Sequence, residues 1–252
     1  MNAVPSPPSD RPAGPAGRIP APAPSSPVPE DRVEELRARL AEVLPGTRAD
    51  LEALVRIPGI AAPAFDPAPL DAGAAAVAEL LRGSGVGDVE VLRATVDGRP
   101  GAPAVVGRIP APAGAPTVLL YAHHDVQPPG EESTWTSPAF EPVERDGRLF
   151  GRGAADDKAG IAVHLAALRV LAGRLGVGVT VFVEGEEEIG SPTFGAFLAA
   201  YRDRLAADVI VVADSANYHL GPCGAFGDVR WGRARRDDRS SHPVRRVVGR
   251  GR

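Results

Sequence analysis

Three apolar, β-rich runs in this chain each end in side chains that can bind a metal ion. The runs cover residues 116–122, 179–184 and 208–213, and they lead into a His-x-Asp sequence, a Glu-rich segment and Asp214. Apolar runs of this kind are typical of strands buried on both faces of a parallel sheet. Because α/β folds keep their chemistry at the carboxyl ends of such strands, the runs predict an α/β fold with a metal site at one edge of its sheet.

The segments around these runs have the patterns of helices and hairpins. We expect helices over residues 30–44, 47–55, 69–82, 158–175 and 193–206, a hairpin of strands over 89–96 and 104–109, and a turn at 146–147. Pro45 and Gly46 are expected to separate the first two helices. From residue 116 onward strands alternate with helices, which predicts a largely parallel sheet, flanked by helices and joined by right-handed crossovers.

The two ends of the chain differ in composition from its middle, so we divide it at residues 30 and 220. Residues 1–29 are rich in Pro and Ala without apolar periodicity and predict a disordered arm, with a Pro-rich docking peptide as the alternative. Residues 221–252 are rich in Arg and Gly and predict a tail without packed structure, with a basic nucleic-acid-binding arm as the alternative. Residues 30–220 are the expected folded domain.

Composition argues against several classes of protein. The net charge of −4 is unlike that of a nucleic-acid-binding domain. No apolar run is long enough for a membrane helix and no signal-peptide pattern is present, so we expect no membrane association and a cytoplasmic location. Cys223 is the single cysteine, so the chain cannot form an internal disulfide.

His123 and Asp125 stand at alternate positions where the first apolar run ends. Strand alternation places them on one side of the sheet and His124 on the other. Asp125 can then bond to the imidazole of His123 and orient it toward a metal ion. A His-x-Asp pair alone is weak evidence, so the metal prediction depends on the carboxylates that accompany it.

Further carboxylates follow in two places. Asp156 and Asp157 come directly after Gly-Arg-Gly at the expected start of a helix, where the helix dipole favours negative charge. One Asp suffices to cap the helix and the other is left to bind a ligand; the alternative is that both only cap. Residues 186–188 are three adjacent glutamates after the second apolar run, and they repel one another unless a cation is present. A solvated charge run is the alternative.

Several ordered motifs together resemble a known family. They are Tyr-Ala-His-His-Asp-Val-Gln-Pro at 121–128, Trp-Thr-Ser-Pro-Ala-Phe-Glu-Pro at 135–142, Gly-Arg-Gly-Ala-Ala-Asp-Asp-Lys at 151–158, Glu-Gly-Glu-Glu-Glu-Ile-Gly-Ser-Pro at 184–192 and Ala-Asp-Ser at 213–215. They resemble the co-catalytic di-zinc exopeptidases and amidohydrolases, which include carnosinase, cytosolic non-specific dipeptidase, glutamate carboxypeptidase and succinyl-diaminopimelate desuccinylase. The dipeptidase branch is the most similar, and the resemblance covers about residues 36–217.

The resemblance implies a phosphorylase/hydrolase-like fold and a site for two zinc ions, with Mn²⁺ or Co²⁺ as alternative metals. His123, Asp156 and Asp214 would hold one zinc, and Asp156 would bridge to a second zinc held by Glu188. Glu187 would be the general base that takes a proton from the water attacking the amide bond of a small peptide. Asp125 keeps its role beside His123, and the peptide bond between Asp156 and Asp157 is expected to be cis.

The sequence departs from the family after the Asp214 region. Relatives carry there a lid domain, through which they form homodimers, and a later segment that supplies the second-site His. We therefore expect a partial zinc-peptidase catalytic domain without the lid, with one tightly held zinc and weak dipeptidase activity. One alternative is a catalytically dead metal-binding fragment, which a frameshift in a GC-rich gene would explain. A further alternative is an adaptor that binds nucleic acid through its Arg-rich tail.

Overall fold

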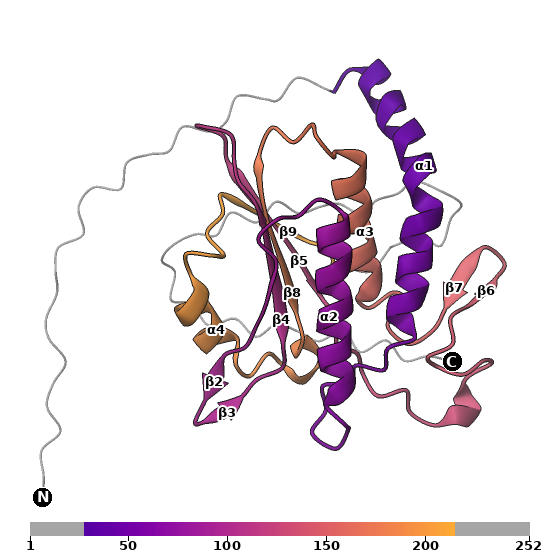
Figure 1. The fold of residues 1–252 in the computed structure, drawn as a ribbon. Helices are drawn as coiled ribbons and strands as arrows, with labels where there is room; N and C mark the ends of the chain where they lie inside the picture. The colour runs from indigo at the N-terminus through magenta and orange to yellow at the C-terminus, as the bar shows by residue number, and fades with distance from the viewer. Residues whose placement is uncertain (1–27, 215–252) are drawn as a thin grey trace, which may run out of the picture.

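A five-stranded sheet forms the centre of the protein. The computed structural model describes residues 28–214, so the predictions for the first 27 residues and for the Arg/Gly tail lie outside the described residues. The strands of the sheet are β1 (Glu90–Leu92), β4 (Ala104–Ile109), β5 (Thr117–His123), β8 (Gly178–Glu184) and β9 (Val209–Val212). They lie in the order β1-β4-β8-β5-β9 (Figure 1).

Four of the five strands run in the same direction. β5 is parallel to both of its neighbours, pairing Leu120 with Val181 of β8 and with Val211 of β9. β4 is antiparallel to β8 and to β1, so it alone is reversed in this sheet. The prediction of a largely parallel sheet in an α/β fold is confirmed.

The predicted hairpin and the predicted turn at residues 146–147 are also present, although the expected strand over 89–96 is divided into two short strands. β1 pairs with β4 as expected, and the connection between them forms a small ladder of its own from β2 (Thr95–Val96) and β3 (Arg99–Pro100). The turn at Asp146 joins β6 (Val143–Arg145) to β7 (Arg148–Phe150), which pair antiparallel.

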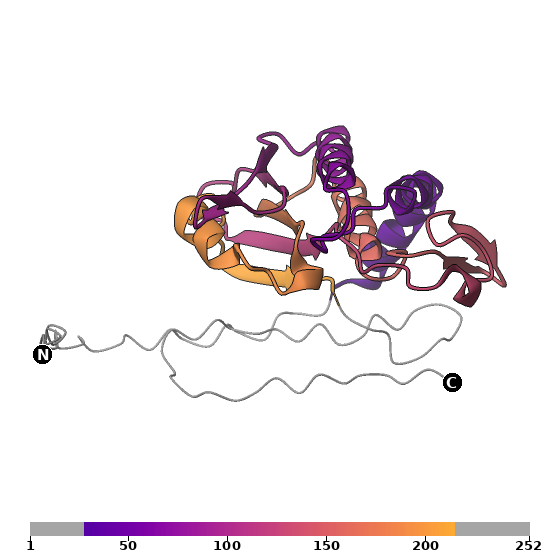
Figure 2. The same ribbon diagram turned by 90° about the horizontal axis from the view of Figure 1, so that it is seen from below.

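Helices cover both faces of the sheet. α1 (Glu30–Val55), α2 (Ala68–Gly83) and α3 (Lys158–Val170) lie on one side, and the short α4 (Phe194–Tyr201) lies on the other, as Figures 1 and 2 show. No helix among the described residues is both long and apolar enough to cross a membrane.

The predicted break at Pro45 is wrong, because α1 continues through this residue. A proline inside a helix removes one backbone hydrogen bond, which favours a break when only the sequence is considered. In the fold, Thr47 is buried and its hydroxyl donates to the carbonyl of Val43 at 3.0 Å instead of capping a second helix. The same hydroxyl accepts a hydrogen bond from Arg169 of α3 at 3.0 Å. Packing against α3 therefore holds the two halves of α1 in line.

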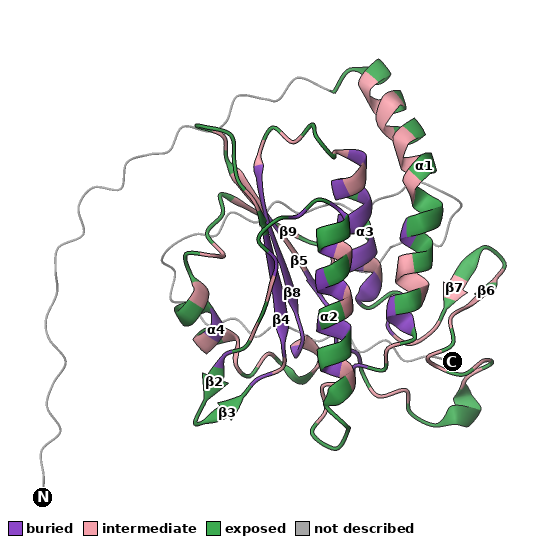
Figure 3. Ribbon diagram, in the orientation of Figure 1, coloured by how far each residue is buried: buried purple, intermediate pink, exposed green. Residues whose placement is uncertain are grey.

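The core has one layer on each side of the sheet. All seven residues of β8 are buried, and buried residues concentrate on β4, β8 and the inner sides of α2 and α3 (Figure 3). On the α3 side, Val181 and Val183 belong to a cluster with Leu165 of that helix. On the α4 side, the ring of Phe182 stacks on that of Phe197 with centroids 5.2 Å apart. β8 is thus the strand that both layers share.

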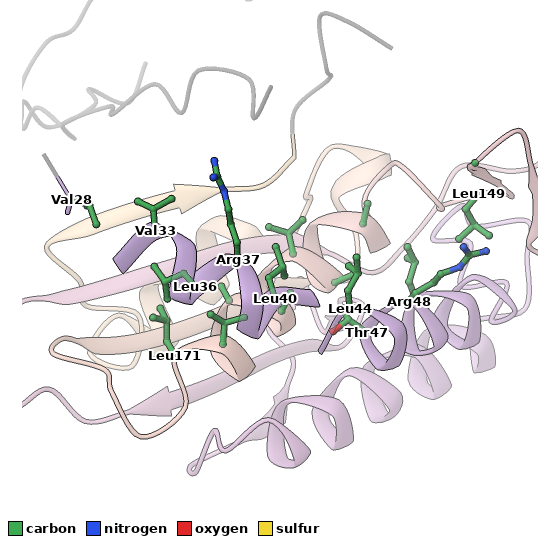
Figure 4. Close-up of a pocket in the computed structure, with 18 residues that line it drawn as sticks. Val28, Val33, Leu36, Arg37, Leu40, Leu44, Thr47, Arg48, Leu149 and Leu171 are labelled. Atoms are coloured by element: carbon green, nitrogen blue, oxygen red, sulfur yellow. The ribbon is translucent and has the colours of Figure 1, made fainter. Parts of the chain in front are cut away.

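An apolar groove with a volume of about 820 Å³ lies between α1, α3 and β7 (Figure 4). Leu36, Leu40 and Leu44 of α1 line it from one side. Val163 of α3, which is half-exposed, lines it from the other. The outer faces of these two helices are therefore less polar than solvent-facing helix surfaces usually are.

We expect Leu165→Ala to lower the free energy of unfolding by about 2–5 kcal/mol, because it removes buried methyl groups and leaves a cavity. Leu165 is fully buried in α3, whereas Leu198 of α4 is 40% exposed and provides the matched control. Urea denaturation of the two alanine variants measures the difference. Equal losses in both would contradict the assignment of Leu165 to the core.

Candidate metal centre

The predicted site residues lie where three neighbouring parallel strands end. β5 ends at His123, which stands beside Glu184, the last residue of β8. Glu187 begins a short 3-10 helix, η2 (Glu187–Ile189), in the turn after β8, and Asp214 follows the end of β9. Because all three strands run the same way, their carboxyl ends bring these side chains to one edge of the sheet.

Two groups of possible metal ligands share His123. The ligand atoms of His123, Glu187 and Asp214 all lie within 4.8 Å of one another, and so do those of His123, Asp156 and Glu188. Asp156 lies with Glu188, as the bridging position that the resemblance implies requires, whereas Asp214 is grouped with Glu187 instead of with Asp156. The four carboxylate residues nevertheless surround a single imidazole, that of His123.

The imidazole of His123 is fully buried and bonded on both sides. Its Nδ1 donates to the backbone carbonyl of Asp125 at 3.1 Å and lies 3.3 Å from the Asp125 carboxylate. Its Nε2 lies 3.1 Å from Asp156 Oδ1 and 3.8 Å from Glu187 Oε2. Burial opposes a positive charge on this ring, but the hydrogen bonds with Asp125 and Asp156 outweigh it and raise the pKa of His123 to about 11.

Asp125 connects His123 to the turn after β8. Its carboxylate is fully buried, and besides lying next to the imidazole it accepts two backbone N–H groups of that turn. Oδ1 accepts from Glu187 at 3.2 Å and Oδ2 accepts from Glu188 at 3.1 Å. The sequence suggested the contact with His123, but not the second contact, which fixes the position of both glutamates relative to the imidazole.

Asp156 and Asp157 have different contacts. The peptide bond between them is cis, as expected. Asp157 is the N-cap of α3: its carboxylate accepts the N–H of Gly160 at 3.2 Å and also the backbone N–H of His123 at 3.2 Å. Burial raises the pKa of Asp157 to about 7. Asp156 instead faces His123, whose hydrogen bond lowers the pKa of Asp156. One carboxylate thus holds the helix and the other is available to a ligand.

Gln127 is a site residue that the sequence analysis missed. Its amide nitrogen donates to the backbone carbonyl of Glu188 and to Glu188 Oε2, both at 2.8 Å. It therefore fixes the carboxylate of Glu188 in place. Strand alternation could have indicated it, because Gln127 continues the spacing of His123 and Asp125 by two more residues.

Comparison with known proteins relates the segment that carries the site to a peptidase family. Residues 119–226 match the model of Peptidase family M20/M25/M40. The segment that contains the candidate ligands is thus similar to this peptidase family. Over 110 residues the chain is 43% identical to the cysteinylglycine-S-conjugate dipeptidase of Corynebacterium striatum. This match covers 42% of this chain and 24% of that protein. Over 107 residues it is 41% identical to a succinyl-diaminopimelate desuccinylase of Xanthomonas euvesicatoria. This match covers 39% of this chain and 24% of that protein.

The fold of human carnosine dipeptidase 1 is also similar, with a TM-score of 0.64 and 26% identity over 73% of this chain and 41% of that one. The chain thus spans about a quarter of the length of these two curated relatives. Members of the M20/M25/M40 family are metal-dependent hydrolases that act on peptides and related amides, and the α/β fold of residues 28–214 corresponds to part of their catalytic domain.

Two further histidines, His124 and His164, have structural roles. Nε2 of His124 donates to the carbonyl of Pro103 at 2.8 Å, and Nε2 of His164 donates to the carbonyl of Tyr121 at 2.9 Å. Burial lowers the pKa of both imidazoles. His219, for which no role was predicted, lies outside the described residues.

Lys158 follows the Asp pair and is buried almost completely, with 1% of its surface exposed. Its Nζ donates to the carbonyl of Ile57 at 2.9 Å, which ties the start of α3 to the segment after α1. Burial lowers the pKa of Lys158 to about 8, although the charge of Asp125 acts in the opposite direction.

The donor set of the site fits zinc. Imidazole nitrogen and carboxylate oxygen are both zinc ligands, and the carboxylates here outnumber the single imidazole. Burial raises the pKa values of Glu187, Glu188 and Asp214, and repulsion from neighbouring carboxylates raises them further. A divalent cation would relieve this repulsion, as the M20/M25/M40 family leads one to expect.

At pH 7 and without metal, we expect His123 to carry a proton on both ring nitrogens, while His124 and His164 are neutral. The pKa of His123 is raised from 6.5 to about 11, so its contribution to stability is fully present below pH 6.5 and is lost as the pH rises toward 11. Nitrogen chemical shifts of the three imidazoles, measured by NMR against pH, report this directly. Asp156→Asn should lower the pKa of His123; a wild-type His123 that titrates near 6.5 would contradict the prediction.

Proposed function

We propose that this chain is the zinc-binding part of a peptidase catalytic domain that hydrolyses the amide bond of small peptides, with dipeptides as the main substrates. The observation that carries the proposal is the meeting of two ligand groups on His123 at the ends of three parallel strands. His123, Asp156, Glu188 and Asp214 are the proposed ligands. The dipeptidase names of the Corynebacterium striatum and human relatives support dipeptides as the substrate class.

Glu187 is the proposed general base. A bound zinc ion would make a water molecule more acidic and would polarise the carbonyl of the substrate. The side chain of Glu187 is 37% exposed, so it is open to water and substrate. Burial nevertheless raises its pKa, which brings it closer to the value at which a carboxylate exchanges protons at neutral pH. Glu187 would accept a proton from the attacking water and pass it to the leaving amine.

Asp125 is the proposed positioning residue for this step. Its contacts with the imidazole of His123 and with the N–H groups of Glu187 and Glu188 keep ligands and base in one arrangement. Such support matters because a small displacement of a general base strongly lowers the rate of the reaction that it catalyses.

The described residues favour one tightly held ion over two. Both ligand groups depend on the imidazole of His123, so a second ion at the described site would be held by carboxylates alone. Carboxylates without an imidazole hold zinc more weakly, and Mn²⁺ or Co²⁺ could replace it there. The same observation favours a second candidate function, namely a protein that binds metal without turning over a peptide.

Zinc stoichiometry and peptide hydrolysis test this proposal together. We expect the purified 252-residue chain to retain one zinc after dialysis and to hydrolyse a panel of dipeptides only near background, because the second ion is weakly held. Added zinc should raise the rate. Glu187→Gln should abolish that rise while it retains the first zinc, and the exposed Glu132→Gln should behave like the wild type.

Each outcome decides a part of the proposal. Failure to retain any zinc would refute the metal site. A rate that rises equally in Glu187→Gln would refute the role of the base. Two retained ions with full activity would refute the weak second site and exclude the metal-binding protein without turnover.

A further inference from the structure

The three adjacent glutamates that follow β8 do not act as one group. Glu187 and Glu188 belong to the two ligand groups around His123. Glu186 is 5% exposed, and its carboxylate bonds to residues on the α4 side of the sheet. It is therefore neither a ligand of the proposed metal site nor part of a solvated charge run.

The carboxylate of Glu186 closes the turn that carries Glu187 and Glu188. Its Oε1 accepts the backbone N–H of Thr193 at 2.7 Å and also the hydroxyl of Thr193. Its backbone carbonyl accepts the N–H of Ser191 at 3.0 Å. The residue before the turn is thus bonded to residues that follow it.

The same carboxylate connects the turn to a distant part of the chain. Oε2 of Glu186 accepts the backbone N–H of Ala102 at 3.0 Å, in the segment that leads into β4. This segment approaches closely because residue 101 is glycine. A Cβ atom at Gly101 would lie 2.3 Å from Thr193 Oγ1 and 3.0 Å from Glu186 Oε2, so a larger residue would force the contact apart.

The turn is consequently held from two sides by buried carboxylates. Asp125 accepts the N–H groups of Glu187 and Glu188 from the side of the imidazole. Glu186 accepts the N–H groups of Thr193 and Ala102 from the other side. Hydrogen bonds to an ionised acceptor are about twice as strong as neutral ones, so both contacts resist displacement of the turn.

We propose that Glu186 is a positioning residue, which keeps Glu187 and Glu188 at their distance from His123 by fixing the far side of the turn. The inference rests on the proposed metal site and extends it to a residue that does not touch the ion. Removal of outer hydrogen-bond partners of metal ligands typically weakens metal binding by about 10–100-fold. The carboxylate of Glu186 bonds to Thr193 and Ala102, not to a ligand itself, so we expect a loss near the lower end of this range when these hydrogen bonds are broken.

Binding of Co²⁺ to the full chain tests this inference independently of catalysis. Visible absorption of Co²⁺ reports its coordination, and competition with a chelator gives the Kd. In Glu186→Gln one carboxylate oxygen becomes an NH₂ group that faces an N–H donor. We expect the Kd to rise by about 10-fold or more, with a changed absorption band and a native circular dichroism spectrum.

Asp50→Asn is the matched control, because it also replaces a carboxylate by an amide, at a partly buried position away from the site. Asp50 pairs with Arg169 at 2.6 Å, near the opposite end of α3 from Asp157. We expect this variant to lose stability but to bind Co²⁺ with the Kd and spectrum of the wild type. An equal loss of affinity in both variants would overturn the inference, because the effect would then follow stability alone.

The remaining outcomes are also decisive. Wild-type affinity in Glu186→Gln would overturn the positioning role and leave the proposed metal site intact. Failure of the wild type to bind Co²⁺ would instead refute the metal site itself. If Glu186→Gln does not fold, Thr193→Val removes only the hydroxyl donor and should weaken Co²⁺ binding several-fold with the same spectral change; unchanged binding in that variant would overturn the inference.

Discussion

The buried carboxylate of Asp125 is the constraint on which the site depends. A fully buried negative charge costs several kcal/mol unless hydrogen bonds and opposite charge compensate it. Here the imidazole of His123 and two backbone N–H groups supply that compensation. They come from the end of β5 and from the turn after β8, so satisfying this one charge brings these two segments together. The spacing of the candidate ligands is thus a consequence of where Asp125 finds its partners.

Most of the sheet could be predicted from the sequence, because buried parallel strands are continuous apolar runs with polar residues at their ends. The continuity of α1 through Pro45 could not be predicted. Rules that consider only neighbouring residues predict that the helix breaks at Pro45. The hydrogen bond between Thr47 and Arg169, which supports the continuous helix, joins residues that are 122 positions apart in the chain. Hydrophobic periodicity contains no information on such a contact. The low helix propensity of proline predicts the local structure only weakly here, because packing against α3 outweighs it.

The candidate site shows the same division between local and distant information. Strand alternation was sufficient to place His123 and Asp125 together. The same two-residue spacing, extended by one step, also predicts that Gln127 lies on that side. Residues 186–188 offered no such guide, because three identical side chains in a row have no periodicity. The direction of Glu186 is decided by Ala102, which lies 84 positions earlier in the chain. Only the folded structure shows that one glutamate of the three turns away.

The burial of Lys158 has a consequence for how this protein can be modified. It is the only lysine in the chain, and in the fold its amine is enclosed and bonded to the carbonyl of Ile57. Acylating reagents, lysine-specific proteases and enzymes that attach groups to lysine therefore find no accessible side-chain amine while α3 remains docked. Reaction at this position would record the opening of the domain, so one residue provides a built-in chemical reporter of unfolding.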